Sequence, residues 1–166
     1  MSADRVTGGV RQIDEVGGNR GLDVMSVDFE PRIVGFLCNW CSHSTAEGMT
    51  GAARRPPPPS IRVIKVTCTG RVDPLFIITA YLRGADGVLV TGCWPGQCHY
   101  KEGNYHARRR VALVKNIFET LGLDADRLHI EWASDSEGRY FAEIATEFDR
   151  RIQQQGPNAT RSEVFC

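Results

Sequence analysis

Residues 61–74 read IRVIKVTCTGRVDP, and this stretch decides the fold. It begins with a short run rich in β-branched and other apolar residues, which is typical of a strand. A cysteine and a glycine turn follow. Asp73 and Pro74 then form a common helix start, with the aspartate as N-cap and the proline at the first helical position. The stretch therefore predicts a strand that leads through a cysteine-bearing turn into a helix.

The same succession of strand and helix recurs on both sides of this stretch. Further strands are predicted at residues 33–38, 87–90 and 127–132, and further helices at about 42–51, 104–121 and 136–153. Because strand and helix alternate four times, with connections long enough for crossovers, we expect the strands to pair in parallel. The prediction is an α/β three-layer sandwich with a four-stranded parallel sheet, flavodoxin-like or Rossmann-like.

This regular pattern covers residues 31–155, and the two ends of the chain differ from it. Residues 1–30 mix Gly, Asp, Arg and Asn with scattered apolar residues, so we expect a flexible or partner-ordered arm. Residues 156–166 open with Gly-Pro and form a short C-terminal tail. Since neither end sustains an apolar period, both are expected to serve partner docking and to contribute little to domain stability.

Composition narrows the class of protein. The chain has 166 residues, with 20 basic and 20 acidic side chains, so its overall field does not favour nucleic acid or membrane surfaces. No secretory signal and no membrane-spanning run is recognisable, which makes a cytoplasmic location the expectation. In that reducing setting the six cysteines indicate metal binding or redox chemistry more than structural disulfides.

Five of the cysteines fall in three clusters, each of which follows directly on a predicted strand. The five are Cys38, Cys41, Cys68, Cys93 and Cys98. Ligands of an open parallel sheet collect beyond the carboxyl ends of its strands, so these thiols are expected to lie side by side. Cys38 and Cys41 could hold a metal from one loop, Cys93 and Cys98 from another, with Cys68 as a further candidate. Thiolates are the ligands of iron–sulfur clusters, which are the first hypothesis.

Two other chemistries fit the same cysteines. Zinc could occupy a tetrahedral thiolate site, but a domain of this size has a sufficient core of its own and less need of a structural metal for stability. A C-x-x-C dithiol at Cys38 and Cys41 could carry out thiol exchange, although it leaves the other three cysteines unexplained. Cys166, at the end of the chain, is not expected to belong to the site.

The residues beside the cysteines suggest a shaped site. Gly70, Gly92 and Gly96 allow close backbone approach and could direct N–H groups at sulfur. Trp40 and Trp94 lie within the two cysteine loops and would either shield a cluster or face a partner. No glycine-rich phosphate loop of a standard pattern is present, so the sequence gives no support for nucleotide or flavin binding.

Three other polar groups have simpler interpretations. His99 is the one histidine placed to support a ligand, because it adjoins Cys98. The basic run at residues 108–110 could be a phosphate site, a docking patch or a solvated helix face. Asp135 and Glu137 could cap the last helix.

Several of these motifs occur together in a known family. They are CNWC at 38–41, CTGRVDP at 68–74, GADGVLV at 84–90, GCWPGQCHY at 92–100 and GNY at 103–105. Over residues 32–150 the chain closely resembles the delta subunit of methyl-viologen-reducing hydrogenase. The chain departs from the family in its N-terminal arm and in its tail ending in Cys166.

The resemblance implies a function. Family members are electron-transfer subunits with one 2Fe-2S cluster, placed between a hydrogenase or formate dehydrogenase and the flavin-containing A subunit of heterodisulfide reductase. On this basis Cys38, Cys41, Cys68, Cys93 and Cys98 are the cluster's candidate ligands, one more than it needs. Such a chain would relay electrons in anaerobic metabolism and have no substrate site of its own.

Overall fold

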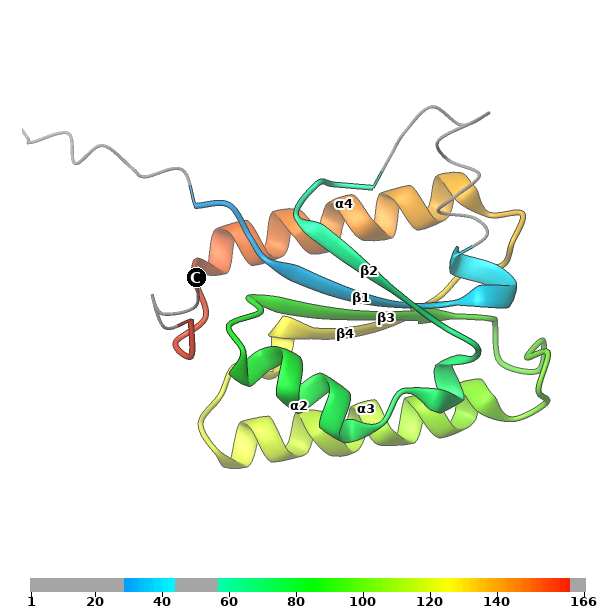
Figure 1. The fold of residues 1–166 in the computed structure, drawn as a ribbon, viewed down its shortest axis with the longest axis horizontal. Coiled ribbons are helices and arrows are strands. Elements are labelled where there is room, and N and C mark those ends of the chain that lie inside the picture. Colours follow the sequence, from blue (N-terminus) through cyan, green and yellow to red (C-terminus); the bar gives the residue numbers. More distant parts are fainter. Residues whose placement is uncertain (1–28, 44–56, 162–166) are drawn as a thin grey trace, which may run out of the picture.

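The structure is a computed structural model that describes residues 29–43 and 57–161 (Figure 1). Its strands are β1 (Ile33–Cys38), β2 (Ile61–Val66), β3 (Gly87–Gly92) and β4 (Leu128–Trp132). Its longer helices are α2 (Pro74–Leu82), α3 (Gly103–Thr120) and α4 (Gly138–Gln155), and the short turns are η1 (Asn39–His43), η2 (Thr69–Arg71) and η3 (Ala125–Arg127). Among these helices none has the length and apolar character needed to cross a membrane.

The strands form one parallel sheet in the order β2-β1-β3-β4. Helices α2 and α3 cover one face and α4 covers the other, so the domain has three layers (Figure 1). The predicted four-stranded parallel sheet is confirmed. Its order matches the first four strands of the flavodoxin-like arrangement, in which β1 lies inside the sheet and ligands bind beyond the carboxyl edge.

Two apolar clusters hold the layers together. Toward α4, Ile33 and Leu37 of β1 pack with Phe141 and Phe148. Toward α2 and α3, the cluster combines strand residues with residues of both helices: Phe36, Val88, Val90, Ile77, Val114 and Phe118. Successive residues of β1 thus point to opposite faces, which explains why this inner strand reads as a continuous apolar run.

The predicted element bounds differ from the structure in places. Strand β3 runs two residues further than predicted, because Thr91 and Gly92 pair with the end of β4. Helix α4 begins two residues later than predicted, because Glu137 accepts a hydrogen bond from the Ser134 backbone N–H and closes a turn before the helix. Of the helix predicted at 42–51, the structure describes the opening turn η1, and the rest lies outside the described residues.

The C-terminal tail packs on the amino edge of the sheet. Asn158 is buried and donates hydrogen bonds from its side chain to two backbone carbonyls near the end of α2, and from its backbone to Asp86. Arg161 forms an ion pair with Asp86 at 2.7 Å. These contacts do not agree with the expectation that the tail contributes little to domain stability. The arm up to residue 28 lies outside the described residues.

Candidate metal centre

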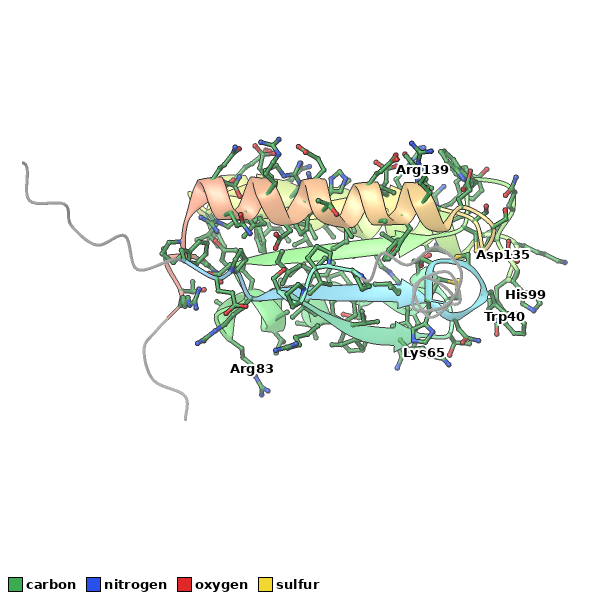
Figure 2. The ribbon with its side chains drawn as sticks, turned by 90° about the horizontal axis from the view of Figure 1, so that it is seen from above. Trp40, Lys65, Arg83, His99, Asp135 and Arg139 are labelled. Atoms are coloured by element: carbon green, nitrogen blue, oxygen red, sulfur yellow. The ribbon has the colours of Figure 1, made fainter. Side chains whose placement is uncertain are left out.

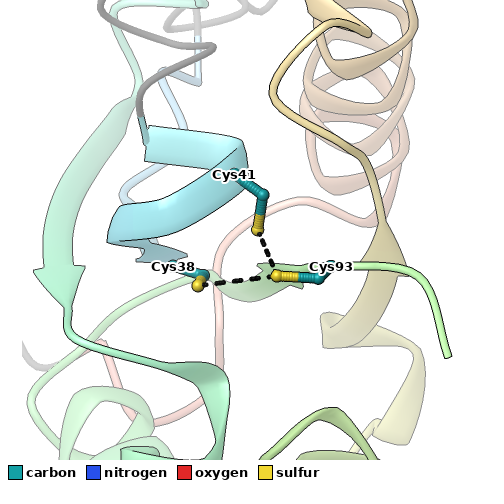
Figure 3. Close-up of side chains that lie close together, drawn as sticks. All are labelled: Cys38, Cys41 and Cys93. Atoms are coloured by element: carbon teal, nitrogen blue, oxygen red, sulfur yellow. Dashed lines mark hydrogen bonds between the residues drawn. The ribbon is translucent and has the colours of Figure 1, made fainter. Parts of the chain in front are cut away.

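Three buried thiols meet at the carboxyl edge of the sheet (Figure 3). Cys38 ends β1, Cys41 lies in the turn after it, and Cys93 follows β3. The Sγ atom of Cys93 is 4.0 Å from that of Cys38 and 3.1 Å from that of Cys41. Because β1 and β3 are parallel neighbours, their ends bring these cysteines together. We call this group the thiol trio.

A buried serine fixes the turn that carries Cys41. The Ser42 hydroxyl accepts a hydrogen bond from the backbone N–H of Cys38 at 3.1 Å and donates one to the carbonyl of Thr91 at 2.8 Å. Since Ser42 is fully buried, both bonds are shielded from water. The serine therefore ties the C-x-x-C turn to β3. Sequence reasoning missed this role, which depends on a partner 49 residues away.

The other two cysteines form a second group beside the trio. The Sγ atoms of Cys68 and Cys98 are 3.6 Å apart, and we call them the thiol pair. Cys68 follows β2 and accepts a hydrogen bond from the Gly70 backbone N–H at 3.4 Å. Cys98, which the sequence associated with Cys93 through their common loop, lies instead against Cys68. The loop folds back over the sheet edge, and Cys98 pairs with Lys101 in an isolated antiparallel β-bridge.

The thiol pair packs against the start of α3. A Cβ atom on Gly103 would overlap the Sγ of Cys68 and lie 3.2 Å from that of Cys98. A Cβ atom on Gly70 would lie 2.7 Å from the Cα of Gly103. Close approach thus requires glycine at both positions, as predicted for Gly70. Gly96 has a different role, because its φ of 87° marks it as a turn residue with nothing close by.

Two polar side chains anchor the loop after β3. Asn104 is buried at the start of α3 and donates hydrogen bonds to the carbonyls of Cys93 and Trp94, at 3.1 and 2.7 Å. Glu137 accepts hydrogen bonds from the Ser134 backbone N–H and the Trp94 indole N–H, both at 2.7 Å. These two donors hold the pKa of Glu137 below its usual range. Neither anchor was assigned to the site from sequence.

Crowding sets the acidity of the trio. Hydrogen bonding with Cys38 and Cys41 holds the pKa of the Cys93 thiol well below its usual range, and the backbone N–H of His99 acts in the same direction. The same contacts with Cys38 and Cys93, together with burial, raise the pKa of Cys41. The neighbouring thiols therefore stabilise one thiolate in the trio. They oppose the ionisation of a second or third thiol. A bound cation would relieve that opposition, because a coordinating thiol is deprotonated by the metal.

Aromatic side chains cover the outside of the site. The rings of Trp40 and His99 stack with centroids 4.0 Å apart, and the Trp40 indole N–H donates to the Tyr100 hydroxyl at 3.2 Å. Figure 2 shows Trp40 and His99 together at the end of the molecule that carries the cysteines. Trp40 and Tyr100 are each about half exposed. Their arrangement fits a surface that faces a partner, since interface cores are enriched in aromatic residues.

The basic run on α3 divides into two kinds of residue. Arg110 donates hydrogen bonds to the carbonyls of Gly70 at 2.6 Å and Val72 at 3.2 Å, and so braces the turn that carries Cys68. Arg108 and Arg109 are exposed. The solvated-face interpretation therefore fits two of the three arginines, while the third supports the site. Cys166 lies outside the described residues.

The donor set fits a thiolate-bound metal. Two thiolates on one tetrahedral metal, each about 2.3 Å from it, stand about 3.8 Å apart. Cys38 and Cys93, at 4.0 Å, and Cys68 and Cys98, at 3.6 Å, are both close to that spacing. Soft sulfur ligands in such an arrangement select iron–sulfur clusters or zinc. All five cysteines predicted from sequence are therefore gathered at one edge, in two adjoining groups.

Comparisons with known proteins agree on one family. The family model for methyl-viologen-reducing hydrogenase, delta subunit, matches residues 33–156. The iron-sulfur D subunit of the F420-non-reducing hydrogenase from Archaeoglobus profundus is 50% identical over 133 residues, which cover 80% of this chain and 96% of that protein. The iron-sulfur D subunit of the vhc F420-non-reducing hydrogenase from Methanococcus voltae is 44% identical, covering 80% of this chain and 92% of that protein.

A third relative is a much longer protein. The A subunit of the ferredoxin:CoB-CoM heterodisulfide reductase from Methanosarcina mazei is 44% identical over 127 residues, which make up 76% of this chain and 16% of that protein. A domain like this one thus also occurs as one part of a larger redox chain.

Proposed function

Because the chain belongs to the family of the delta subunit of methyl-viologen-reducing hydrogenase, we propose that it is an electron-transfer subunit that carries one 2Fe-2S cluster. The observation that carries the proposal is the meeting of five thiols from three separate loops at one sheet edge. When bound, the cluster would take up and release single electrons. The protein's part is to bind it, shield it and hold it near the surface.

The ligands are proposed from the two thiol groups. A 2Fe-2S cluster takes four cysteine ligands, two on each iron. The thiol pair supplies two ligands, Cys68 and Cys98, whose spacing fits one iron. The trio supplies the other two, with Cys93 at its centre and Cys38 at the matching distance. Cys41 is then the additional thiol of the site. The geometry gives no reason to set Cys68 apart, although the sequence placed it outside the two loop pairs as a further candidate.

The partners are proposed from the relatives. One relative carries a domain of this kind inside the A subunit of a heterodisulfide reductase, which supports a flavoprotein of that type, a heterodisulfide-reductase-like A subunit, as the neighbour of this chain. Other relatives are named as hydrogenase subunits, which supports a hydrogenase as the electron donor, with formate dehydrogenase as the alternative donor. Separate chains would then dock, and so form the contacts that a fused chain makes within one molecule.

The exposed aromatic surface gives the relay a route to a partner. Trp40 and Tyr100 lie outside the site and His99 links them to the Cys98 loop. A partner seated here would bring its own cofactor close to the thiols. The chain would thus pass electrons through, and the chemistry of the substrate would belong to the assembled complex.

Zinc is the second candidate, favoured by one observation: the all-thiol donor set is equally that of a closed tetrahedral zinc site. The chain would then be a bridging protein without redox activity. Visible absorption separates the two, because ferric sulfide centres are brown and zinc thiolates are colourless. A metal-free dithiol enzyme would instead react stoichiometrically with a thiol reagent at Cys38 or Cys41.

Electron transfer itself is tested by rapid mixing. The anaerobic protein is reduced with dithionite, freed of excess reductant and mixed with the oxidised A subunit from the same organism. We expect reoxidation of the cluster absorption together with bleaching of the flavin. Ovalbumin in place of the flavoprotein is the control. A cluster that stays reduced in a demonstrated complex with the flavoprotein would overturn the relay role while leaving the cluster itself established.

A further inference from the structure

An apolar groove of about 690 Å³ lies between helix α2 and the β2 edge of the sheet. None of the five thiols lines it. Apolar side chains from two strands and the helix form most of its surface, namely Val34, Phe36, Ile64, Leu75 and Phe76. Three arginines also line it: Arg32, Arg62 and Arg83. No carboxylate is among its described lining residues, so the groove combines an apolar floor with positive charge.

The residues of the groove have the character of a covered surface. Helix α2 is apolar on nearly all sides, as is usual for a helix that is packed all round. Yet Leu75 is 67% exposed and Phe76 is 40% exposed, and Ile64 on the facing strand is 46% exposed. A contiguous exposed patch of this kind marks a binding site rather than free surface.

The described start of the chain lies beside one end of the groove. Gly84 lines that end, and a Cβ atom on it would lie 3.4 Å from the Cα of Arg161. The guanidinium of Arg161 in turn lies over the ring of Phe29, 5.2 Å from its centroid. Arg83, also of this end, projects far from Trp40 and His99 (Figure 2). The described chain therefore begins, at Phe29, at a point next to the groove.

The preceding residues complement the groove in both charge and polarity. Residues 22–30 read LDVMSVDFE, with five apolar side chains, three acidic ones and no basic one. Fully extended, the seven residues 22–28 span up to about 24 Å. Helix α2, with nine residues, is only about 13 Å long. The segment is thus long enough to run the length of the groove.

We propose that residues 22–28 bind in this groove of their own chain, with apolar side chains against Phe36, Ile64 and Phe76 and acidic ones toward the arginines. The partner that orders this part of the arm is then the domain itself. The family match begins at residue 33, so the occupant is an addition to the matched domain. This inference goes beyond the electron-transfer role and does not depend on it.

Photo-crosslinking of the purified full-length protein tests the occupant. A benzophenone amino acid replaces Leu75, which is exposed enough to accept it without disturbing the fold. Equal amounts of isotope-labelled and unlabelled chains are irradiated, and the linked peptides are identified by mass spectrometry. We expect links to residues 22–28 of the same chain. The matched control carries the same group at Leu113, which is 53% exposed on α3 and outside the groove.

Charge reversal tests the complementarity. Asp28 directly precedes Phe29, the first described residue, and the proposal pairs its carboxylate with Arg83. We expect Arg83→Glu to lower the yield of the Leu75 crosslink by about two- to fivefold, as for loss of an exposed ion pair. Adding Asp28→Arg to that variant should restore the yield, because the opposite charges are exchanged.

Any of four results would overturn the proposal. Links between a labelled and an unlabelled chain would assign the groove to a second copy. Links to no part of residues 22–28, or an equal yield of such links from the Leu113 control, would show that the arm does not occupy the groove. An Arg83→Glu yield unchanged by Asp28→Arg would show that charge pairing does not place the segment.

Discussion

The two ends of the sheet hold their buried polar groups in opposite ways. At the amino end, the carboxylate of Asp86 is fully buried and accepts hydrogen bonds from the backbone of Arg32 and Asn158 and from the guanidinium of Arg161. At the carboxyl end, the thiols of the trio are also buried, but they contact chiefly one another. A thiol is a weak hydrogen-bond donor and acceptor, so these contacts stabilise the fold little.

Because of this difference, we expect stability and metal binding to depend on opposite ends of the sheet. The amino end is a completed network, whose loss leaves buried charges without partners. The carboxyl end is a set of soft ligands on a frame that other residues hold: Ser42, Asn104, Glu137 and Arg110. We therefore expect changes at the amino end to lower stability and changes among the thiols to abolish metal binding.

The largest expected effect is on metal content. Replacing Cys93→Ser removes the thiol at the centre of the trio, and we expect iron in the purified protein to fall to background. The free energy of unfolding of the metal-free form should change by less than about 1 kcal/mol, because the thiol contacts are weak. Iron analysis and urea unfolding measure the two quantities. Cys166→Ser is the control and should keep its iron. Retention of full iron by the Cys93 variant would break the comparison.

At the other end of the sheet the effect should be reversed. Replacing Asp86→Ala leaves Arg161 without its buried partner and removes an anchor of the tail. We expect the free energy of unfolding to fall by about 3–5 kcal/mol, with iron per folded chain unchanged. Urea unfolding followed by circular dichroism measures the loss. The exposed Asp126→Ala should change the free energy by less than about 0.5 kcal/mol. Equal stability of the two variants would refute a structural role for Asp86.

Gly103 is expected to affect both stability and metal binding. A methyl group on Gly103 would overlap the Sγ of Cys68. We expect Gly103→Ala to lower the free energy of unfolding by about 1–3 kcal/mol, as for overpacking of a core, and to reduce iron content by displacing the thiol pair. Thermal melts and iron analysis check this. Arg109→Ala, on the exposed face of the same helix, should change neither. A Gly103→Ala protein with normal iron would mean that Cys68 and Cys98 need not approach α3.

These residues also show how far the sequence predicts the site. The succession of strands and helices along the chain and the capping of α2 by Asp73 could be predicted because they depend on local patterns. The gathering of five cysteines at the carboxyl edge followed from parallel pairing alone. The association of Cys98 with Cys68 could not be predicted, since it depends on how the loop after β3 folds back.

The supporting residues were missed for a related reason. Ser42 and Asn158 act through backbone carbonyls far along the chain, and Asn104 acts through carbonyls of the preceding loop. No spacing in the sequence records such contacts. The one available signal was a polar residue beside a ligand-bearing loop. If such a residue is buried, its side chain must pair with another polar group. The tail was underestimated in the same way: its short polar sequence conceals the buried side chain of Asn158.

The smallest effect should come from the basic run on α3. Replacing Arg110→Ala removes two hydrogen bonds to the turn that carries Cys68. We expect a loss of about 1–2 kcal/mol in the free energy of unfolding and faster loss of iron to a chelator. Arg108→Ala should match the wild type in both measurements, because its side chain is exposed. Identical behaviour of the two variants would show that the Cys68 turn needs no brace.

The central claim is that the thiols of the carboxyl end hold one redox-active cluster. Its most direct test is the content of iron, acid-labile sulfide and zinc in anaerobically purified protein, combined with electron paramagnetic resonance after reduction. We predict about two irons and two sulfides per chain, and a signal from the reduced form that is lost in the Cys93→Ser variant. One zinc per chain without acid-labile sulfide, and no signal on reduction, would contradict the account.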